Sequence, residues 1–181
     1  MMHSKRSSLL WLNALGGAAV LLSYAWGLGT SAGPGASLWG GVPESARWIY
    51  TVNMFLAAAG YFLFTPYILF RLPAATTRIG GTRGYGVFHL LYALVLLPSA
   101  LWLPLTAHVL ARPSAFAWAL VRIDLALVAV GSLGLLAALL ALSSEVPRGR
   151  TLAVIGLLPF CLQTAVLDAL VWPAYFSLPT P

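Results

Sequence analysis

The sequence predicts an all-α membrane protein, a bundle of five transmembrane helices forming a single membrane domain over residues 1–181. Three observations lead to this class. Of the 181 residues, 60% are hydrophobic, and only 8% are charged, against roughly a quarter in ordinary soluble domains. The apolar residues fall into five runs of about 20 residues or more, the length that one helix needs to cross a bilayer core. Because a chain exposed to lipid must satisfy its own backbone hydrogen bonds, such runs indicate helices.

The five runs are separated by breaks that hold turn formers and charges. Lys5 and Arg6 precede the first run, as they would in a signal peptide, but its length of about 20 apolar residues exceeds the roughly 7 to 15 of a cleaved segment. We therefore expect a retained helix. Only residues 111–114 separate the third and fourth runs, which is typical of an antiparallel helical hairpin. The expected helices span residues 9–28, 48–70, 85–110, 115–142 and 151–176.

Lysine and arginine residues are distributed unequally between the two ends of these helices. The opposite end from the N-terminus carries two in its loops, Arg47 and Arg112, with Arg122 just inside the fourth helix. Because such residues concentrate on the cytoplasmic side, we expect a cytoplasmic N-terminus and an outer C-terminus, in the inner membrane if the cell is bacterial. The net charge of +6 thus indicates membrane borders and not a nucleic-acid partner. The N-terminal end carries Lys5, Arg6, Arg71, Arg78, Arg83, Arg148 and Arg150.

Tryptophans gather toward the outer ends of the predicted helices. A belt of interfacial aromatic residues accounts for each one singly, whereas an aromatic pocket in the outer half accounts for the asymmetry. The outer loop, about residues 29–47, holds Trp39 and leads to Trp48. A lid over an outer cavity and a simple flexible loop are both open interpretations of this loop. The six outer tryptophans are Trp26, Trp39, Trp48, Trp102, Trp118 and Trp172, and the inner one is Trp11.

Ionisable residues inside the predicted helices also lie in the outer half. An ionised group in hydrocarbon costs at least about 2.5 to 3.5 kcal/mol and usually faces a protein interior or a cavity. Arg122 and Asp124 are two residues apart, so they cannot share a helix face. We expect Arg122 to extend toward the outer interface. Asp124 and Asp168 are then expected to find a partner or to stay protonated.

Two predicted helices carry polar and aromatic stripes. A selectively polar face on a membrane helix indicates contact with protein or water, although close packing through small residues explains such faces equally well. The glycines Gly16, Gly17, Gly60, Gly131, Gly134 and Gly156 are most simply interpreted as sites of close packing. The stripe of the third helix holds His89, Tyr92, Ser99, Trp102 and Thr106, and that of the fifth holds Thr164, Asp168 and Trp172.

The sequence offers little support for metal or catalytic chemistry. His89 and His108 are 19 residues apart on one predicted helix, a separation of about 28 Å in height that prevents them from sharing a metal ion. The single cysteine, Cys161, excludes an internal disulfide and an all-cysteine metal site. We assign no catalytic or metal-ligating residue and expect no enzyme activity. No cofactor is required, and porphyrin or haem is considered only as a ligand.

Short motifs in the last three predicted helices resemble the TspO/MBR family, the tryptophan-rich sensory proteins and translocator proteins. The chain departs from the family in having Val95 and Ser99 where the family's third helix carries glutamine and asparagine, and Asp168 in place of an asparagine in the fifth. The resemblance implies a pocket for a tetrapyrrole, a sterol or a similar flat ligand, commonly in a homodimer. The motifs are Leu91-Tyr92, Trp102-Leu103-Pro104, Trp118 to Val121 with Asp124-Leu125, and Pro159-Phe160 followed by Thr164, Asp168 and Trp172.

Two functions of different classes follow. The first is binding of a hydrophobic, flat small molecule in an aromatic pocket of the outer half. The alternative is a non-catalytic structural or assembly subunit that contacts a partner in a larger membrane complex. A single-chain transporter is less favoured, because no inverted repeat is visible. The candidate ligand-binding residues are Tyr92, Ser99, Trp102, Trp118, Asp124, Thr164, Asp168 and Trp172, with Trp39 and Trp48 as candidate lid residues.

Overall fold

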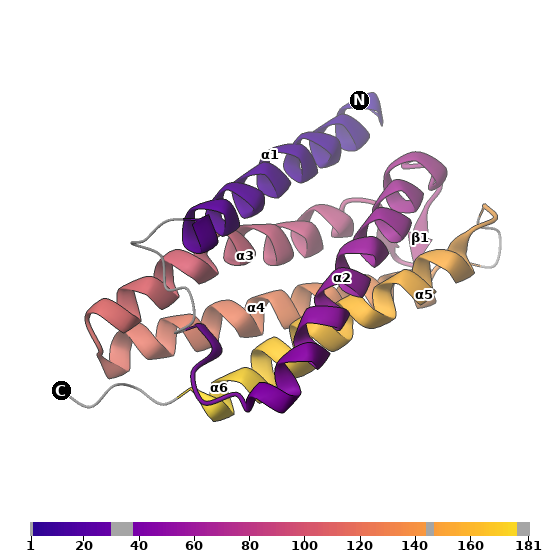
Figure 1. The fold of residues 1–181 in the computed structure, drawn as a ribbon. Coiled ribbons are helices and arrows are strands. Elements are labelled where there is room, and N and C mark those ends of the chain that lie inside the picture. Colours follow the sequence, from indigo (N-terminus) through magenta and orange to yellow (C-terminus); the bar gives the residue numbers. More distant parts are fainter. Residues whose placement is uncertain (1, 30–37, 144–146, 177–181) are drawn as a thin grey trace.

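The computed structural model describes residues 2–29, 38–143 and 147–176. It is an all-α bundle with five helices long and apolar enough to span a membrane, as the sequence predicts (Figure 1). Two of the five continue as π-helix, in which the backbone hydrogen bond reaches five residues along the chain. The spans are α1 (Met2–Gly29), α2 (Glu44–Pro66) with η2 (Tyr67–Arg71), α3 (Val87–Ala111), α4 (Ala115–Leu140), and α5 (Arg150–Cys161) with η3 (Leu162–Val171) and α6 (Trp172–Tyr175).

The helix boundaries differ from the predicted ones by a few residues at most ends. The α1 helix begins seven residues earlier than predicted, since polar residues before Leu9 continue it. The α2 helix begins at Glu44, directly after Pro43, and an acidic residue in the first turn of a helix is electrostatically favourable. The α4 helix ends at Leu140, two residues early, because Leu142 instead forms an antiparallel bridge with Ile79.

The helices pack in an order that differs from their order in the chain. The α1 helix lies along α3, α3 along α4, α4 along α5 and η3, and α5 along α2. The first two helices of the chain are therefore at opposite ends of this series. They diverge toward the end of the bundle opposite the N-terminus (Figure 1). We call that end the outer end, and the end that holds the N-terminus the inner end. Nearer the inner end, the Tyr61 hydroxyl on α2 donates a hydrogen bond of 2.5 Å to Asn13 Oδ1 on α1.

Glycines allow the closest helix contacts. A Cβ atom added to Gly60 of α2 would collide with the backbone carbonyl of Gly156 on α5, so these two helices meet backbone to backbone. Gly131 and Gly134 of α4 fit against α3, and Gly16 of α1 fits against Leu96, in each case with no room for a methyl group. The expectation of close packing is wrong for Gly17, because no atom lies within 4 Å of a Cβ built there.

A short β-hairpin, absent from the sequence prediction, covers the inner end of the bundle. Strands β1 (Arg78–Ile79) and β2 (Arg83–Gly84) pair in antiparallel register. Gly80 and Gly81 form the turn with φ values of 57° and 76°, a left-handed conformation that glycine adopts without steric cost. The Gly80 amide donates to the Ala141 carbonyl at 2.9 Å. The hairpin is thereby fixed to the end of α4.

The core has an inner and an outer part. The inner part holds Phe64, Phe88 and the fully buried Tyr92. The outer part collects side chains around Tyr50, Leu125 and Trp172. The residues predicted to bind a ligand are therefore divided between two packing regions at different depths.

Candidate ligand-binding site

Three predicted site tryptophans form an aromatic cluster in the outer half. Trp172 of α6 lies at its centre, with its ring centroid 5.8 Å from that of Trp102 on α3 and 5.7 Å from that of Trp118 on α4. The Trp118 ring also stacks on Phe176 at 5.0 Å and 18°. The Trp172 indole donates a hydrogen bond of 2.7 Å to the Leu38 carbonyl. The structure brings these three tryptophans together, and Trp118 and Trp172 stack on other aromatic side chains of the chain.

Tyr24 of α1, which the sequence analysis did not single out, borders this cluster. Its ring lies 5.9 Å from the Trp102 ring. Tyr24 thus extends the aromatic cluster onto α1.

The two intramembrane carboxyl groups come from neighbouring helices. Asp124 of α4 is 5% exposed. Asp168 of η3 accepts a hydrogen bond of 2.8 Å from the Gln163 amide. Gln163 Oε1 in turn accepts a 3.0 Å hydrogen bond from Asn53 Nδ2 of α2. This polar chain runs from α2 to Asp168, and sequence reasoning missed its two uncharged members.

Two residues of the predicted stripe on the fifth helix have different partners. The Thr164 hydroxyl hydrogen-bonds to Ser132 Oγ of α4 at 2.7 Å. Asp168 instead bonds to Gln163, five residues earlier. In a π-helix the backbone hydrogen bond reaches five residues along the chain, which brings Gln163 and Asp168 onto one side of the helix.

Four buried side-chain polar atoms have no hydrogen-bond partner among the described residues. They are Ser23 Oγ, Trp102 Nε1, Thr106 Oγ1 and Asp124 Oδ2. All four lie in the outer half, on α1, α3 and α4. A buried polar group left without a partner costs about 1 to 3 kcal/mol, and such groups are uncommon in native structures. One of the four, the indole nitrogen of Trp102, belongs to the ring beside Tyr24.

The remaining predicted residues lie apart from this group. Tyr92 is fully buried in the inner half and donates to Thr65 Oγ1 at 2.9 Å, so its hydroxyl is already satisfied. His89, one α-helical turn closer to the inner end, hydrogen-bonds to Ser8 Oγ at 2.8 Å. Ser99 is partly buried on α3, between the two regions. The residues of the stripe predicted on the third helix therefore lie at different depths and in different packing regions.

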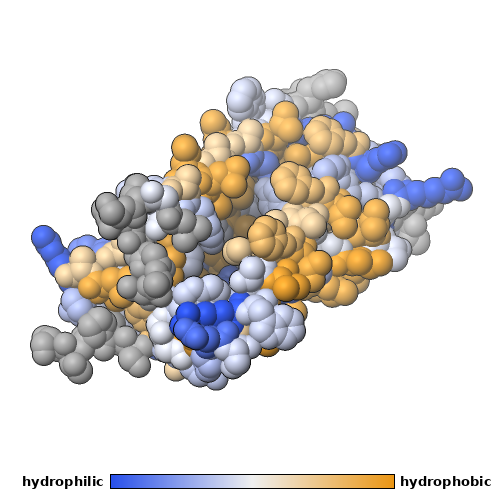
Figure 2. Space-filling view, in the orientation of Figure 1, coloured by the Kyte–Doolittle hydropathy of each residue, from blue (hydrophilic) through white to orange (hydrophobic). Residues whose placement is uncertain are grey.

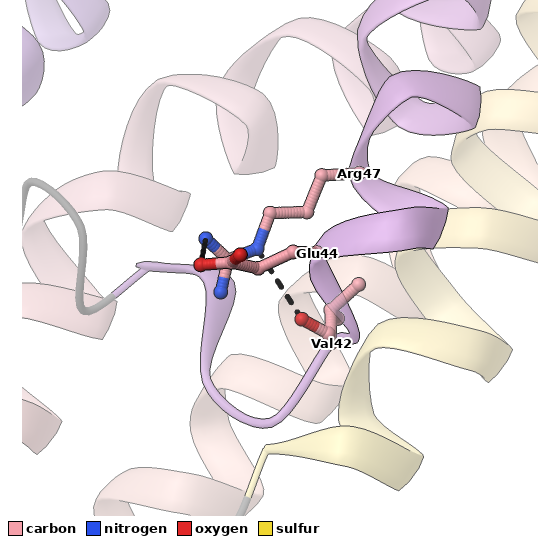
Figure 3. Close-up of polar contacts among 3 residues, drawn as sticks. All are labelled: Val42, Glu44 and Arg47. Carbon is pink, nitrogen blue, oxygen red and sulfur yellow. Dashed lines mark hydrogen bonds and ion pairs between the residues drawn. The ribbon is translucent and has the colours of Figure 1, made fainter.

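The two candidate lid residues have different surroundings. Trp39 packs edge-on against Tyr50 at 6.0 Å and lies under the Arg47 guanidinium at 5.5 Å. Arg47 is held by an ion pair of 3.7 Å to Glu44 and by a hydrogen bond from its Nε to the Val42 carbonyl (Figure 3). Trp48 is 64% exposed and points away from the bundle. Residues 30–37 of the predicted lid lie outside the described residues.

The surface of the protein is recessed between α1 and α2 (Figure 2). Two further surface grooves lie elsewhere. One of about 370 Å³ is lined by Arg122 and alanines of α4 and η3, and one of about 400 Å³ lies between the hairpin and Gly134. Neither groove is lined by a predicted site residue.

The exposure of Arg122 and the burial of Asp124 match the opposite faces predicted for them. Across residues 2–29, 38–143 and 147–176, no group of three His, Cys, Asp or Glu side chains is arranged to hold a metal ion. The site is therefore an aromatic and carboxyl-containing group without metal ligands. Comparison of the chain with family models, curated proteins and solved structures gives no match.

Proposed function

We propose that the protein binds a flat hydrophobic small molecule, such as a porphyrin, a sterol or a compound of similar shape, in the outer half between α1, α3, α4 and η3. The observation that carries this proposal is the set of four unpartnered buried polar atoms on α1, α3 and α4, one of which is the indole nitrogen of Trp102 beside Tyr24. Apolar walls with a few convergent polar groups are the usual composition of a small-molecule site. The resemblance to the TspO/MBR family favours the same class of ligand.

The proposed roles of the aromatic residues follow from their exposure. Trp102 and Tyr24 are partly buried and would contact the ligand, because an aromatic face buries a large area at a low conformational cost. Trp172 is 4% exposed and would hold Trp102 in place. Asp124 and Asp168 would contact the polar part of the ligand. The proposed activity is binding, without catalysis.

A structural or assembly role is the second candidate, and the exposure of α1 favours it. Within its most apolar window only 17% of the residues of α1 are buried, against 28% to 50% in the other four spans. The large apolar side chains on its free face include Leu15, Leu21 and Leu22, which are 66% to 72% exposed. This face would contact lipid, a second copy of the chain or a partner subunit.

The distribution of basic residues also leads us to propose the orientation of the protein, with the N-terminus, the β-hairpin and the α4–α5 connection in the cytoplasm. Seven Lys and Arg residues lie at that end. The outer-half site would then face the extracytoplasmic leaflet. A chain that binds a ligand from this side would take it from the membrane or from the outer aqueous phase.

Tryptophan-fluorescence titration of the purified protein with protoporphyrin, haem and a sterol tests the proposed binding. Saturable quenching that Trp102→Phe weakens by about tenfold, and that Trp48→Phe leaves unchanged, would support the proposal. Trp48 is a matched control because it is exposed at the same end of the bundle. Non-saturable curves for every ligand, with one partner co-purifying in fixed ratio, would favour the subunit role instead.

A further inference from the structure

We infer that the groove between the β-hairpin and the α3–α4 pair binds an anionic phospholipid, with its phosphate at Arg83 and Thr82 and an acyl chain lying along α4. The groove is at the inner end of the bundle, so this site is separate from the proposed ligand site in the outer half. The inference does not depend on that proposed function. With the proposed orientation the groove opens to the cytoplasmic leaflet, which carries the anionic lipids.

The groove has a volume of about 400 Å³ and two walls of different origin, one from the hairpin and one from α3 and α4. This volume is large enough for a ligand, since small-molecule sites measure roughly 300 to 1,000 Å³. The hairpin wall is fixed in place by the hydrogen bond of 2.9 Å from the Gly80 amide to the Ala141 carbonyl. In the helical wall Gly134 packs against Leu91 with no room for a methyl group. Both walls are therefore held by contacts within the bundle.

The lining of the groove changes from polar to apolar along its length. Thr82 and Arg83 line it at the hairpin, outside the membrane-spanning segments. Ala137 and Ala141, both exposed, line it along α4, and Gly134 lines it furthest from the end of that helix. Gly134 is seven residues from Ala141, or about 10 Å along the helix axis. A phospholipid has the same order of chemistry, with a charged headgroup at the interface and hydrocarbon beneath it.

The register of the hairpin directs Arg83 to the groove. Arg83 is the strand partner of Ile79 in the antiparallel pair, and side chains of directly opposed residues lie on the same face of a sheet. Ile79 is 6% exposed, and it lines the groove together with Arg83. The arginine is itself exposed. Its guanidinium is thus available at the mouth of the groove.

The charge of Arg83 has no acidic partner among the described residues. The one ion pair in that part of the chain joins Arg47 to Glu44 at the outer end. The other described acidic residues, Asp124 and Asp168, also belong to the outer half, and Glu145 lies outside the described residues. An anion that binds at the hairpin would therefore meet a positive charge that no described carboxylate neutralises.

Two further arginines add positive charge at this end of the groove. The C-terminus of a helix carries a partial negative charge, and by itself the end of α4 would repel a phosphate. Arg150 donates hydrogen bonds to the carbonyls of Leu140 and Leu142 there, which offsets this effect. Arg78 is exposed on the neighbouring strand. The polar end of the groove is therefore basic overall.

These features match the phosphate of an anionic lipid better than that of a zwitterionic one. A guanidinium can donate two parallel hydrogen bonds to a phosphate, and the Thr82 hydroxyl is a further donor. Basic pockets between membrane helices on the cytoplasmic side bind anionic headgroups. Phosphatidylcholine carries an ammonium group beside its phosphate, which the arginines would repel. The groove should therefore select phosphatidylglycerol over phosphatidylcholine.

Photocrosslinking in vesicles tests this selection. The full-length protein is reconstituted in phosphatidylcholine vesicles that contain a trace of photoactivatable phosphatidylglycerol or phosphatidylcholine, each with the same diazirine-bearing acyl chain, and labelled residues are located by mass spectrometry. We expect phosphatidylglycerol to label residues 134–141 at least fivefold more than phosphatidylcholine, since one arginine near the surface is sufficient for that factor. The exposed face of α1, at Leu15 and Leu21, should be labelled equally by both lipids.

Two variants separate the headgroup contact from the acyl-chain contact. Arg83→Gln should lower the preference for phosphatidylglycerol by about fivefold. Ala137→Leu should lower the labelling by both lipids, because the larger side chain fills the groove. Arg112→Gln is the matched control, since it removes the same charge at an exposed position at the outer end of the bundle. Its labelling should equal that of the unaltered protein.

Three outcomes would overturn the inference. The first is equal labelling of residues 134–141 by the two lipids, and the second is a preference that Arg83→Gln leaves unchanged. The third is labelling that Ala137→Leu leaves unchanged, which would place the lipid on the hairpin surface and not in the groove. If a variant fails to fold, the comparison of the two lipids on the unaltered protein still decides the question. None of these results bears on the outer-half site, which the fluorescence titration tests separately.

Discussion

The side-chain amide of Gln163 donates a 2.8 Å hydrogen bond to the carboxyl group of Asp168, five residues further along the same helix. The segment between them is π-helical, from Leu162 to Val171. Helical segments of this kind are rare and occur frequently at functional sites. The π-helix places Asp168 within hydrogen-bond distance of the Gln163 amide. The oxygen of the same amide accepts a hydrogen bond from Asn53 of α2.

The hydrogen bond between Asn53 and Gln163 should couple α2 to η3 energetically. We expect Asn53→Ala and Gln163→Ala each to lower the free energy of unfolding, with a coupling energy in the double variant of about 0.6 to 1.7 kcal/mol, the range for interhelical hydrogen bonds in membranes. Unfolding in mixed detergent micelles measures it. Thr51→Ala with Gln163→Ala is the control pair, since Thr51 hydrogen-bonds only within α2. Additive effects for Asn53 and Gln163 would contradict the coupling.

The sequence was sufficient to predict the number and class of the helices, because membrane-length apolar runs are a strong signal. It was not sufficient to place side chains around the fifth helix. The spacing of Thr164 and Asp168 suggested one stripe, but Thr164 hydrogen-bonds to Ser132 of α4 and Asp168 to Gln163 of its own helix. Asn53 and Gln163 are also polar residues inside predicted spans. The expectation that an ionisable residue in a span faces the protein interior applies to uncharged polar residues as well, and it would have identified both.

The tryptophans illustrate a second limit. Their position at the outer end follows from the sequence, but their contacts depend on how the helices pack. The helix order brings Trp102, Trp118 and Trp172 onto one another, and no periodicity within one helix reveals such a contact. For the same reason Tyr24 was missed, since its ring contact is with Trp102 of another helix, α3.

Trp172 should contribute more to stability than to ligand affinity. It is 4% exposed and donates to the Leu38 carbonyl. Replacement by phenylalanine removes this hydrogen bond and part of the packing with Trp118, so we expect a loss of about 1 to 3 kcal/mol. Thermal unfolding in detergent, followed by tryptophan fluorescence, measures this loss. A variant with unchanged stability and abolished binding would show instead that Trp172 contacts the ligand.

The approach of α2 to α5 should depend on the absence of side chains at Gly60 and Gly156. Replacement of Gly60 by alanine places a methyl group against the Gly156 carbonyl, and overpacking of this kind typically costs about 1 to 3 kcal/mol. Gly17→Ala is the matched control, since a Cβ there meets no atom within 4 Å. Alanine favours a helix over glycine by up to about 1 kcal/mol, so this control should be neutral or slightly stabilising. Equal stabilities for the two variants would show that α2 and α5 do not pack this closely.

The proposed orientation predicts which loops a membrane-impermeant maleimide reaches in intact cells. The hairpin turn holds Thr82 and the α3–α4 connection holds Pro113, both exposed, and the native Cys161 is buried. Because one span, α3, separates Thr82 from Pro113 and basic residues stay in the cytoplasm, Pro113→Cys should label in intact cells. Thr82→Cys should label only after the membrane is opened. The reverse pattern would place the two carboxyl groups in the cytoplasmic half of the bilayer, and the ligand would then have to come from inside the cell.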